Sequence, residues 1–266
     1  MYADFLDDHD QPVRAEFIRL QCEIARLEVG PRAVVDANWR LWKRQQDLLD
    51  DHLPEVLGPA ALLAGFRPGV HRGFVGAVVL PVGEFVRTGG RVADLLPLPQ
   101  VAVTNVAADH PGFFQSPHLG CVAAATVYDP DAMTDEVCLE VAAGFREHAH
   151  RLAHLTDLHL GGCGVNDVAM ADLAVAALPA LGDLDLTACF LSDAGVVALL
   201  NGPLARQLTR LVLDFNFMVG DQAAFELADR LGKVPTFRTL DFRHTRVTSA
   251  GQAALTAAFG SRCNLF

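Results

Sequence analysis

Four histidines close together in the middle of the chain are the first residues whose type and spacing could do chemistry. They are His148, His150, His154 and His159. On a helix, the i, i+4 spacing of His150 and His154 would place both imidazoles on one face, where they could bind zinc. The glutamate of the H-E-x-x-H motif is missing, however, and Arg151 lies between the two histidines. The pattern therefore favours a solvated helix end or a turn over a metal site.

Other motifs associated with ligands or catalysis are incomplete. Asp129-Pro-Asp131 with Asp135-Glu136 resembles a calcium loop, but the central glycine of such loops is missing. Gly161-Gly-Cys-Gly164 has neither the G-x-G-x-x-G spacing nor a phosphate-binding lysine, and the sequence contains no nucleophile elbow. We therefore predict no catalytic residue, no metal and no cofactor, with a metal-dependent hydrolase as the least favoured alternative.

The composition predicts a folded, acidic protein. Hydrophobic residues make up 51% and charged residues 20% of the 266 residues, which argues against disorder. The net charge is −11 and the chain has no run of Lys or Arg. Nucleic acid is therefore not an expected partner, whereas a basic protein segment would suit the charge balance.

The sequence also predicts a cytoplasmic protein without a membrane span. The N-terminus is acidic where a signal peptide would be basic, and the most apolar window, residues 73–86, is too short to cross a bilayer. The six cysteines form no CxxC pair, so neither a disulfide framework nor a structural zinc site is expected.

The elements that would position a site come from one phrase that occurs four times. In each copy two apolar residues alternate with another residue, which is the period of a strand with one buried face. The copies begin at Leu158, Leu184, Leu211 and Leu240. A small side chain then occupies the turn position, where we expect it to satisfy backbone groups of the turn. These turn residues are Cys163, Cys189, Asn216 and Thr245.

A helix is expected after each turn. Small or acidic pairs suited to a helix N-cap come next, and an apolar run at helical spacing follows them. The pairs are Asn166-Asp167, Ser192-Asp193, Gly220-Asp221 and Thr248-Ser249. Each unit is thus predicted to run strand, turn, helix, and stacked units would form a parallel sheet covered by helices on one side.

The phrase resembles the leucine-rich repeat, L-x-L-x-x-N/C-x-L, and its spacing lies within the roughly 20 to 29 residues of that class. The Asp193-Ala-Gly195 start of one helix is similar to the ribonuclease-inhibitor-like subclass. This resemblance implies an α/β solenoid with parallel strands on its concave face and helices on its convex face. It also implies a non-enzymatic scaffold that recognises a protein or peptide partner.

Residues 1–70 contain no repeat and are predicted to form an all-α module. Apolar residues from Val13 to Leu27 recur on one face of a helix that starts at Pro12. A second helix is expected from Ala33 to about His52, and a short third one over residues 54–66. We expect these helices to cap the open edge of the first solenoid strand.

The first part of this module resembles the bacterial repeat-companion domain, which precedes leucine-rich repeats and implies no activity. The resemblance lies in Tyr2-Ala-Asp-Phe-Leu-Asp-Asp and Arg14-Ala-Glu-Phe-Ile-Arg-Leu, and it covers about the first 50 residues. Members usually have a further segment before this motif, so we expect either a start further upstream or a shortened first helix.

The solenoid is predicted to span residues 71–266, irregular over 71–150 and regular over 151–266. A buried strand is expected over residues 73–80 and a helix over 81–96. Degraded copies of the phrase are expected at 101–106 and 119–127. The last residues, 260–266, contain no evident cap.

The candidate site is the concave face of the solenoid. Strands about 4.8 Å apart would bring the middle polar positions of the repeats into one row, where like carboxylates repel one another and would favour a cationic partner. The alternative is a set of merely solvated strand positions. The predicted partner-binding residues are Asp157, His159, Asp183, Asp185, Arg210, Asp214, Asp241 and Arg243.

A function of a different class would use the N-terminal helices. In an assembly or regulatory adaptor, Trp39, Arg40 and Trp42 would be exposed anchors for a partner. Burial of both tryptophans would argue against this alternative.

Overall fold

A computed structural model describes residues 2–27, 38–58, 60–61, 69–71, 74–94 and 100–265. The chain divides into two compact units: unit 1 is Met1–Val79 with Arg91–Gln100, and unit 2 is Leu80–Gly90 with Val101–Phe266. The predicted helix start at Ala33 lies outside the described residues, as do residues 59 and 62–66 of the expected third helix.

Unit 1 begins with helices whose apolar faces meet. Phe17 is fully buried and packs with Leu48 and Val56 in one cluster. Arg44 donates to Glu16 with both Nε and Nη2, at 2.7 and 2.9 Å, which joins the second helix to the next one described. The helix predicted from Pro12 is confirmed. The helices of unit 1 are α1 (Tyr2–Asp7), α2 (Pro12–Leu27), α4 (Trp39–Asp51) and α5 (Leu53–Leu57).

An antiparallel pair of strands follows these helices. The strand predicted over residues 73–80 is β2 (Phe74–Pro81), and it pairs with β1 (Gly69–His71). The expectation of an all-α module over residues 1–70 is therefore wrong at its end. A strand of three residues is too short to show an alternating pattern in the sequence.

Unit 2 contains a parallel sheet that follows the order of the chain. Each strand pairs in parallel with the next one along the sequence. The strands are β3 (Gln100–Thr104), β4 (Val122–Thr126), β5 (Asp157–His159), β6 (Asp183–Asp185), β7 (Arg210–Val212), β8 (Thr239–Asp241) and β9 (Cys263–Asn264). The degraded copies of the phrase are confirmed as β3 and β4. The last strand, β9, was not predicted, and it continues the sheet beyond β8.

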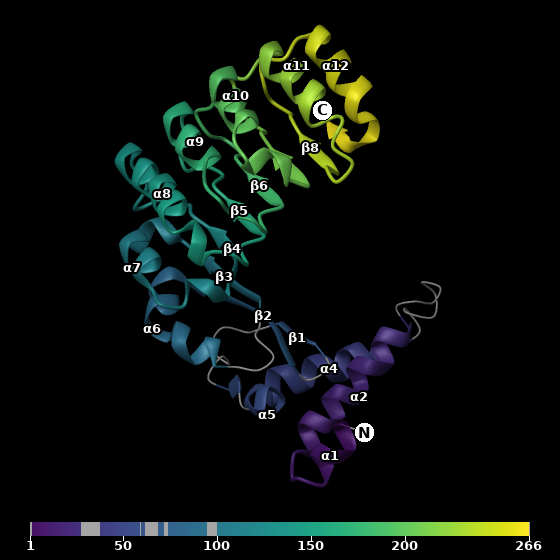
Figure 1. The fold of residues 1–266 in the computed structure, drawn as a ribbon. Coiled ribbons are helices and arrows are strands. Elements are labelled where there is room, and N and C mark those ends of the chain that lie inside the picture. The colour runs from purple at the N-terminus through teal and green to yellow at the C-terminus, as the bar shows by residue number, and fades with distance from the viewer. Residues whose placement is uncertain are drawn as a thin grey trace. The chain divides into compact units, whose positions relative to one another are not determined.

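Helices connect the strands of unit 2, and in Figure 1 α8 to α12 lie on the outer side of β4 to β8. These helices are α7 (His110–Gln115), α8 (Asp135–Glu147), α9 (Asp167–Ala174), α10 (Asp193–Asn201), α11 (Asp221–Arg230) and α12 (Ser249–Phe259). The earlier α6 (Val82–Ala93), predicted over 81–96, crosses the boundary between the units. Short 3-10 turns are η2 (Val106–Asp109), η3 (Leu119–Cys121), η4 (Ala149–Arg151), η5 (Leu204–Arg206) and η6 (Gly260–Arg262).

The leucines of the repeated phrase stack in the core of unit 2. The first leucine of each copy is fully buried and lies in register with the first leucine of the next copy. This row consists of Leu158, Leu184, Leu211 and Leu240. The second apolar position is also buried in every copy, and there Phe242 takes the place of a leucine in the last one. The strands are therefore held by two stacked apolar rows.

The small residue after each strand satisfies turn backbone, as the sequence predicts. Fully buried Asn216 is the clearest case. Its Nδ2 donates to Leu186 O of the preceding repeat (2.8 Å) and to Leu213 O (3.0 Å), and its Oδ1 accepts from Leu191 N (3.3 Å). The equivalent Thr245 makes one such bond, to the carbonyl of Phe242.

Aspartates at the helix starts join each repeat to the next one. Asp167 Oδ1 accepts from Ser192 N (2.9 Å), and its Oδ2 accepts from Ser192 Oγ (2.6 Å). The residue pairs are Asp167 with Ser192, Asp193 with Gly220, and Asp221 with Thr248. The sequence predicts these aspartates as part of the N-cap of their own helix. The structure shows that their carboxylates instead bond the N-cap residue of the following helix.

Removing the Asn216 side chain should destabilise unit 2 strongly. In Asn216→Ala, the buried Leu191 N–H and Leu186 carbonyl lose their partner, and each buried unsatisfied group costs about 1–3 kcal/mol. We expect a loss of about 3 kcal/mol in the free energy of unfolding, measured by urea denaturation. Thr245→Ala, at the same position with a single hydrogen bond, should lose at most about 1 kcal/mol. Equal losses in the two variants would contradict this assignment.

A glycine-to-alanine change in α10 should lower stability although alanine favours helices. The Cβ of an Ala at position 195 would overlap the Asp167 carboxylate and lie 2.9 Å from Leu191 Cδ2. We expect Gly195→Ala to lose about 1–2 kcal/mol by overpacking. Gly83→Ala in α6, where a Cβ meets nothing within 4 Å, should instead gain up to about 1 kcal/mol. Thermal denaturation of both variants measures the two signs, and a gain at position 195 would refute the packing argument.

Candidate functional site

The predicted site residues lie along one side of strands β5 to β8. The register aligns Asp157, Asp183 and Arg210 in one row. A second row contains His159, Asp185, Val212 and Asp241, as the spacing predicts. Asp214 lies two residues after the end of β7, and Arg243 lies two residues after the end of β8. Because strand side chains alternate with a period of two, both belong to the same side of the sheet as these rows. We call the predicted set of eight residues the strand face: Asp157, His159, Asp183, Asp185, Arg210, Asp214, Asp241 and Arg243.

The β5 and β6 end of the strand face is acidic. Asp157 and Asp183 are directly paired neighbours, and their side chains are half-buried. Asp157 Oδ2 accepts from Thr156 Oγ1 at 2.6 Å, and Asp185 Oδ1 accepts from Thr187 N at 2.8 Å. These bonds orient the carboxylates of Asp157 and Asp185 without neutralising their charge. Asp183 is ion-paired with Arg210, so the negative potential of this end comes from Asp157 and Asp185.

Arginines neutralise most of the remaining carboxylates. Arg210 Nη1 bonds both oxygens of Asp183, at 2.9 and 3.0 Å. Arg243 holds Asp241 with Nε and Nη2, and its Nη2 also lies 3.0 Å from Asp214 Oδ2. Asp214 is 5% and Asp241 9% exposed, so both support Arg243 and offer little surface to a partner. The expected row of mutually repelling carboxylates is thus replaced by ion pairs, one between β6 and β7 and the others at β7 and β8.

The strand face contains one histidine, His159, and its imidazole lies close to the Asp185 carboxylate. Nδ1 of His159 lies 3.8 Å from Asp185 Oδ2, an electrostatic contact rather than a hydrogen bond by distance. The Asp185 carboxylate raises the pKa of His159, although burial acts in the opposite direction. Burial also opposes ionisation of Asp185, but His159 and the Thr187 bonds outweigh it and lower the pKa of Asp185 to about 2.

The histidines considered for zinc do not share a helix. Helix α8 ends at Glu147, and His150 lies in the 3-10 turn η4. Arg151 Nη1 donates to Phe114 O at 2.8 Å and fixes this turn, and His154 follows after the turn. Across the described ranges, no three His, Cys, Asp or Glu side chains gather as a metal site would require.

The remaining candidate motifs have structural roles. Asp129 Oδ2 accepts from Asn105 Nδ2, and its Oδ1 accepts from Asp131 N, which closes a turn. Burial raises the pKa of Cys163 and raises that of Cys189 to about 12. The two thiols are therefore protonated at neutral pH, which does not favour nucleophilic chemistry.

An apolar feature next to the strand face escaped sequence reasoning. Large apolar side chains are exposed in the turns after β6 and β7, and we call these four residues the apolar patch: Phe190, Phe215, Phe217 and Met218. A signal was present in the sequence. Phe190 and Phe217 both directly follow a turn residue, at a point where the strand alternation has ended and an apolar side chain has no core position to fill.

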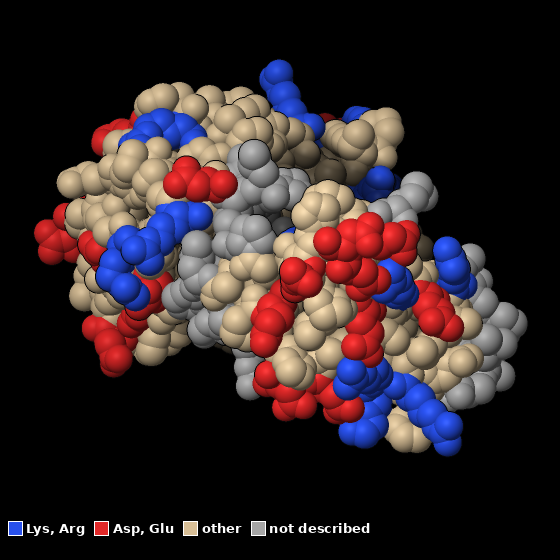
Figure 2. Space-filling view, turned by 90° about the horizontal axis from the view of Figure 1, so that it is seen from below, with Lys and Arg blue, Asp and Glu red and all other residues tan. Residues whose placement is uncertain are grey.

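The surface seen in Figure 2 shows small groups of Lys and Arg beside acidic side chains. Of the helices described, none is long and apolar enough to cross a membrane.

Residues 151–174, which contain β5 and α9, match a family described as Leucine Rich repeat. This segment is similar to one leucine-rich repeat. The parallel strands, the stacked leucine rows and the buried turn residues are the structure that this match implies. The ribonuclease-inhibitor-like subclass and the repeat-companion domain, in contrast, rest on the sequence resemblance alone.

Comparison with solved structures gives distant similarity. A crystal structure of a Bacteroides fragilis protein is 12% identical, with a TM-score of 0.39, and the alignment covers 68% of this chain and 71% of that one. A likeness this distant carries no information about function. No curated protein matches the sequence.

The pKa of His159 should depend on Asp185. We expect an NMR titration of the imidazole to give a value above the ordinary 6.5 in the wild type. In Asp185→Asn the pKa of His159 should fall below its wild-type value, because burial is then opposed only by Asp183 and Asp157. The pair therefore stabilises the fold at pH values below the ordinary pKa of histidine, and this contribution is lost as the pH rises through the raised pKa. An unchanged pKa of His159 in Asp185→Asn would show that the Asp185 carboxylate does not raise it.

Proposed function

We propose that this protein is a non-enzymatic scaffold whose strand face binds a basic segment of a protein partner. The observation that carries the proposal is the charge of that face. It contains five aspartates against two arginines, in fixed register on one sheet, and its acidic end lies on β5 and β6.

The rigidity of the sheet supports this proposal. Each polar side chain of the strand face stands beside a fully buried leucine or, for Arg243, beside buried Phe242, so its position is set by the core. A single exposed ion pair contributes little, about 0.2–1 kcal/mol. Carboxylates held in register can act together without an ordering cost for each, and complementary charge mainly gives specificity and a fast encounter.

Reversing the charge of the acidic end should abolish selection of basic ligands. A random peptide library is selected on the wild type and on the double variant Asp183→Lys, Asp185→Lys. We expect Lys- and Arg-rich peptides to be enriched on the wild type, with affinity at least about tenfold lower for the variant at low salt and a smaller difference at high salt.

The control is Glu226→Lys with Asp229→Lys on α11, which makes the same charge change on the helix side. A denaturation curve shows that each variant is folded. Equal loss of binding in both variants would mean that only net charge matters, and equal binding to the wild type and the strand-face variant would reject the proposal.

The second candidate, an adaptor that works through unit 1, keeps one supporting observation. Trp39 is 57% exposed and Trp42 is only partly buried on α4, so the burial that would have argued against it does not occur. Trp39→Ala in the full chain distinguishes the candidates. A ligand that is lost in this variant and retained in the strand-face variant would assign recognition to unit 1.

A further inference from the structure

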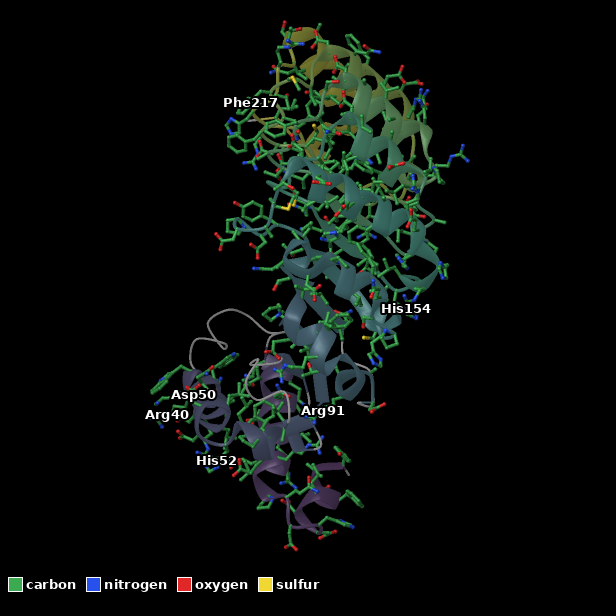
Figure 3. All side chains as sticks on the ribbon, turned by 90° about the vertical axis from the view of Figure 1, so that its left-hand side faces the viewer. Arg40, Asp50, His52, Arg91, His154 and Phe217 are labelled. Carbon is green, nitrogen blue, oxygen red and sulfur yellow. The ribbon has the colours of Figure 1, made fainter. Side chains whose placement is uncertain are left out.

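The apolar patch exposes large apolar side chains in the turns after β6 and β7. Phe190 is 64% and Phe217 68% exposed, and Phe215 and Met218 are also exposed. Figure 3 shows Phe217 pointing outward from unit 2. Together with Leu191, these side chains line a groove of about 210 Å³. Large apolar side chains gathered on a surface mark interaction sites more often than aromatic residues scattered singly do.

The backbone holds one residue of this patch, Phe215, in a costly conformation. The residue at the same turn position of each repeat has a left-handed φ, and these residues are Gly162, Ala188, Phe215 and His244. A left-handed φ costs a bulky residue about 1–2 kcal/mol compared with glycine. Phe215 nevertheless occupies this position, where its ring stacks on His244 at 4.2 Å and meets Phe217 edge-on at 6.1 Å.

The acidic end of the strand face adjoins this patch through one short turn. Asp185 Oδ1 accepts hydrogen bonds from the N–H (2.8 Å) and the hydroxyl (2.6 Å) of Thr187, the residue that opens the turn leading to Phe190. An extended peptide advances about 3.3 Å per residue, so a few residues span this turn. One short segment could therefore contact both the carboxylates and the exposed rings.

We propose that the apolar patch and the acidic end of the strand face together bind an extended protein segment with one large apolar side chain and a Lys or Arg a few residues away. The apolar side chain enters the groove between Phe190 and Phe217, and the basic side chain reaches Asp185, which lies beside the Asp183–Arg210 ion pair. This inference rests on the proposed function and adds the second half of the ligand.

Charge favours such a segment over two other occupants of an apolar surface. A second copy of this chain would bring another net charge of −11 to the interface. An anionic lipid surface would face the carboxylates of the adjoining strands. A basic and apolar segment complements both halves of the surface.

The test uses synthetic peptides of about nine residues, long enough to cover the turn. One set contains a Leu or Phe and a Lys at varied spacing, a second set contains the Lys alone, and a third the apolar residue alone. Fluorescence anisotropy measures their affinity for the full chain. We expect the first set to bind best at one spacing and Phe217→Ala to weaken that binding at least tenfold, which corresponds to about 1.4 kcal/mol. Binding of the Lys-only set should not change.

The matched control is Phe225→Ala, which removes a half-exposed phenylalanine from α11. Equal effects of the two phenylalanine variants, or equal affinity of the first two peptide sets, would overturn the inference while leaving a basic partner possible. If Asp183→Lys, Asp185→Lys binds all sets like the wild type, the proposed function itself fails. Dimerisation or binding to anionic vesicles that disappears in Phe217→Ala would assign the patch to one of the rejected occupants.

Discussion

The stacked leucines of unit 2 impose the constraint from which the other features follow. Because Leu158, Leu184, Leu211 and Leu240 must meet in one row, each repeat has to return its chain to the same height on the next strand. The turn then needs an internal hydrogen-bonding residue, since its backbone is buried between neighbouring repeats. The N-cap residue of each helix must also be held against the helix before it. The aspartate at the start of that preceding helix supplies this bond. Single repeats cannot complete these contacts, so the array stabilises itself through its interfaces.

Sequence reasoning found the elements because their signals are local. Alternation placed the strands, and small polar pairs placed the helix starts. The partners of charged residues are not local: Asp183 meets Arg210 only because the register joins two repeats. The pairing of Arg243 with Asp241 was within reach, since both lie on one side of a strand, but the burial of Asp214 and Asp241 depends on packing. The strand β9 escaped because two residues show no period.

Unit 1 and the first repeats illustrate a different limit. The helix from Pro12 follows from its apolar face, whereas the antiparallel pair of β1 and β2 depends on contacts that composition does not encode. In the irregular part of unit 2, aromatic packing replaces the leucine pattern: Phe113, Phe114 and Phe145 form a buried group, and the ring of Phe114 occupies the space where Gly144 lacks a Cβ. A core of this kind is specific to its own side chains and gives no repeating signature.

The residue with a left-handed φ in each turn can differ in its side chain while the backbone path of the turn stays the same. The turns at Gly162, Ala188, Phe215 and His244 keep the same backbone path although their side chains range from none to aromatic. The hydrogen bonds that close these turns come from other positions, such as Asn216. Each repeat therefore offers one outward position whose identity can change while the solenoid stays intact. Exchanging residues at this position from repeat to repeat would alter the outline of the surface without redesigning the core, so a new specificity could arise by substitution at a few turns.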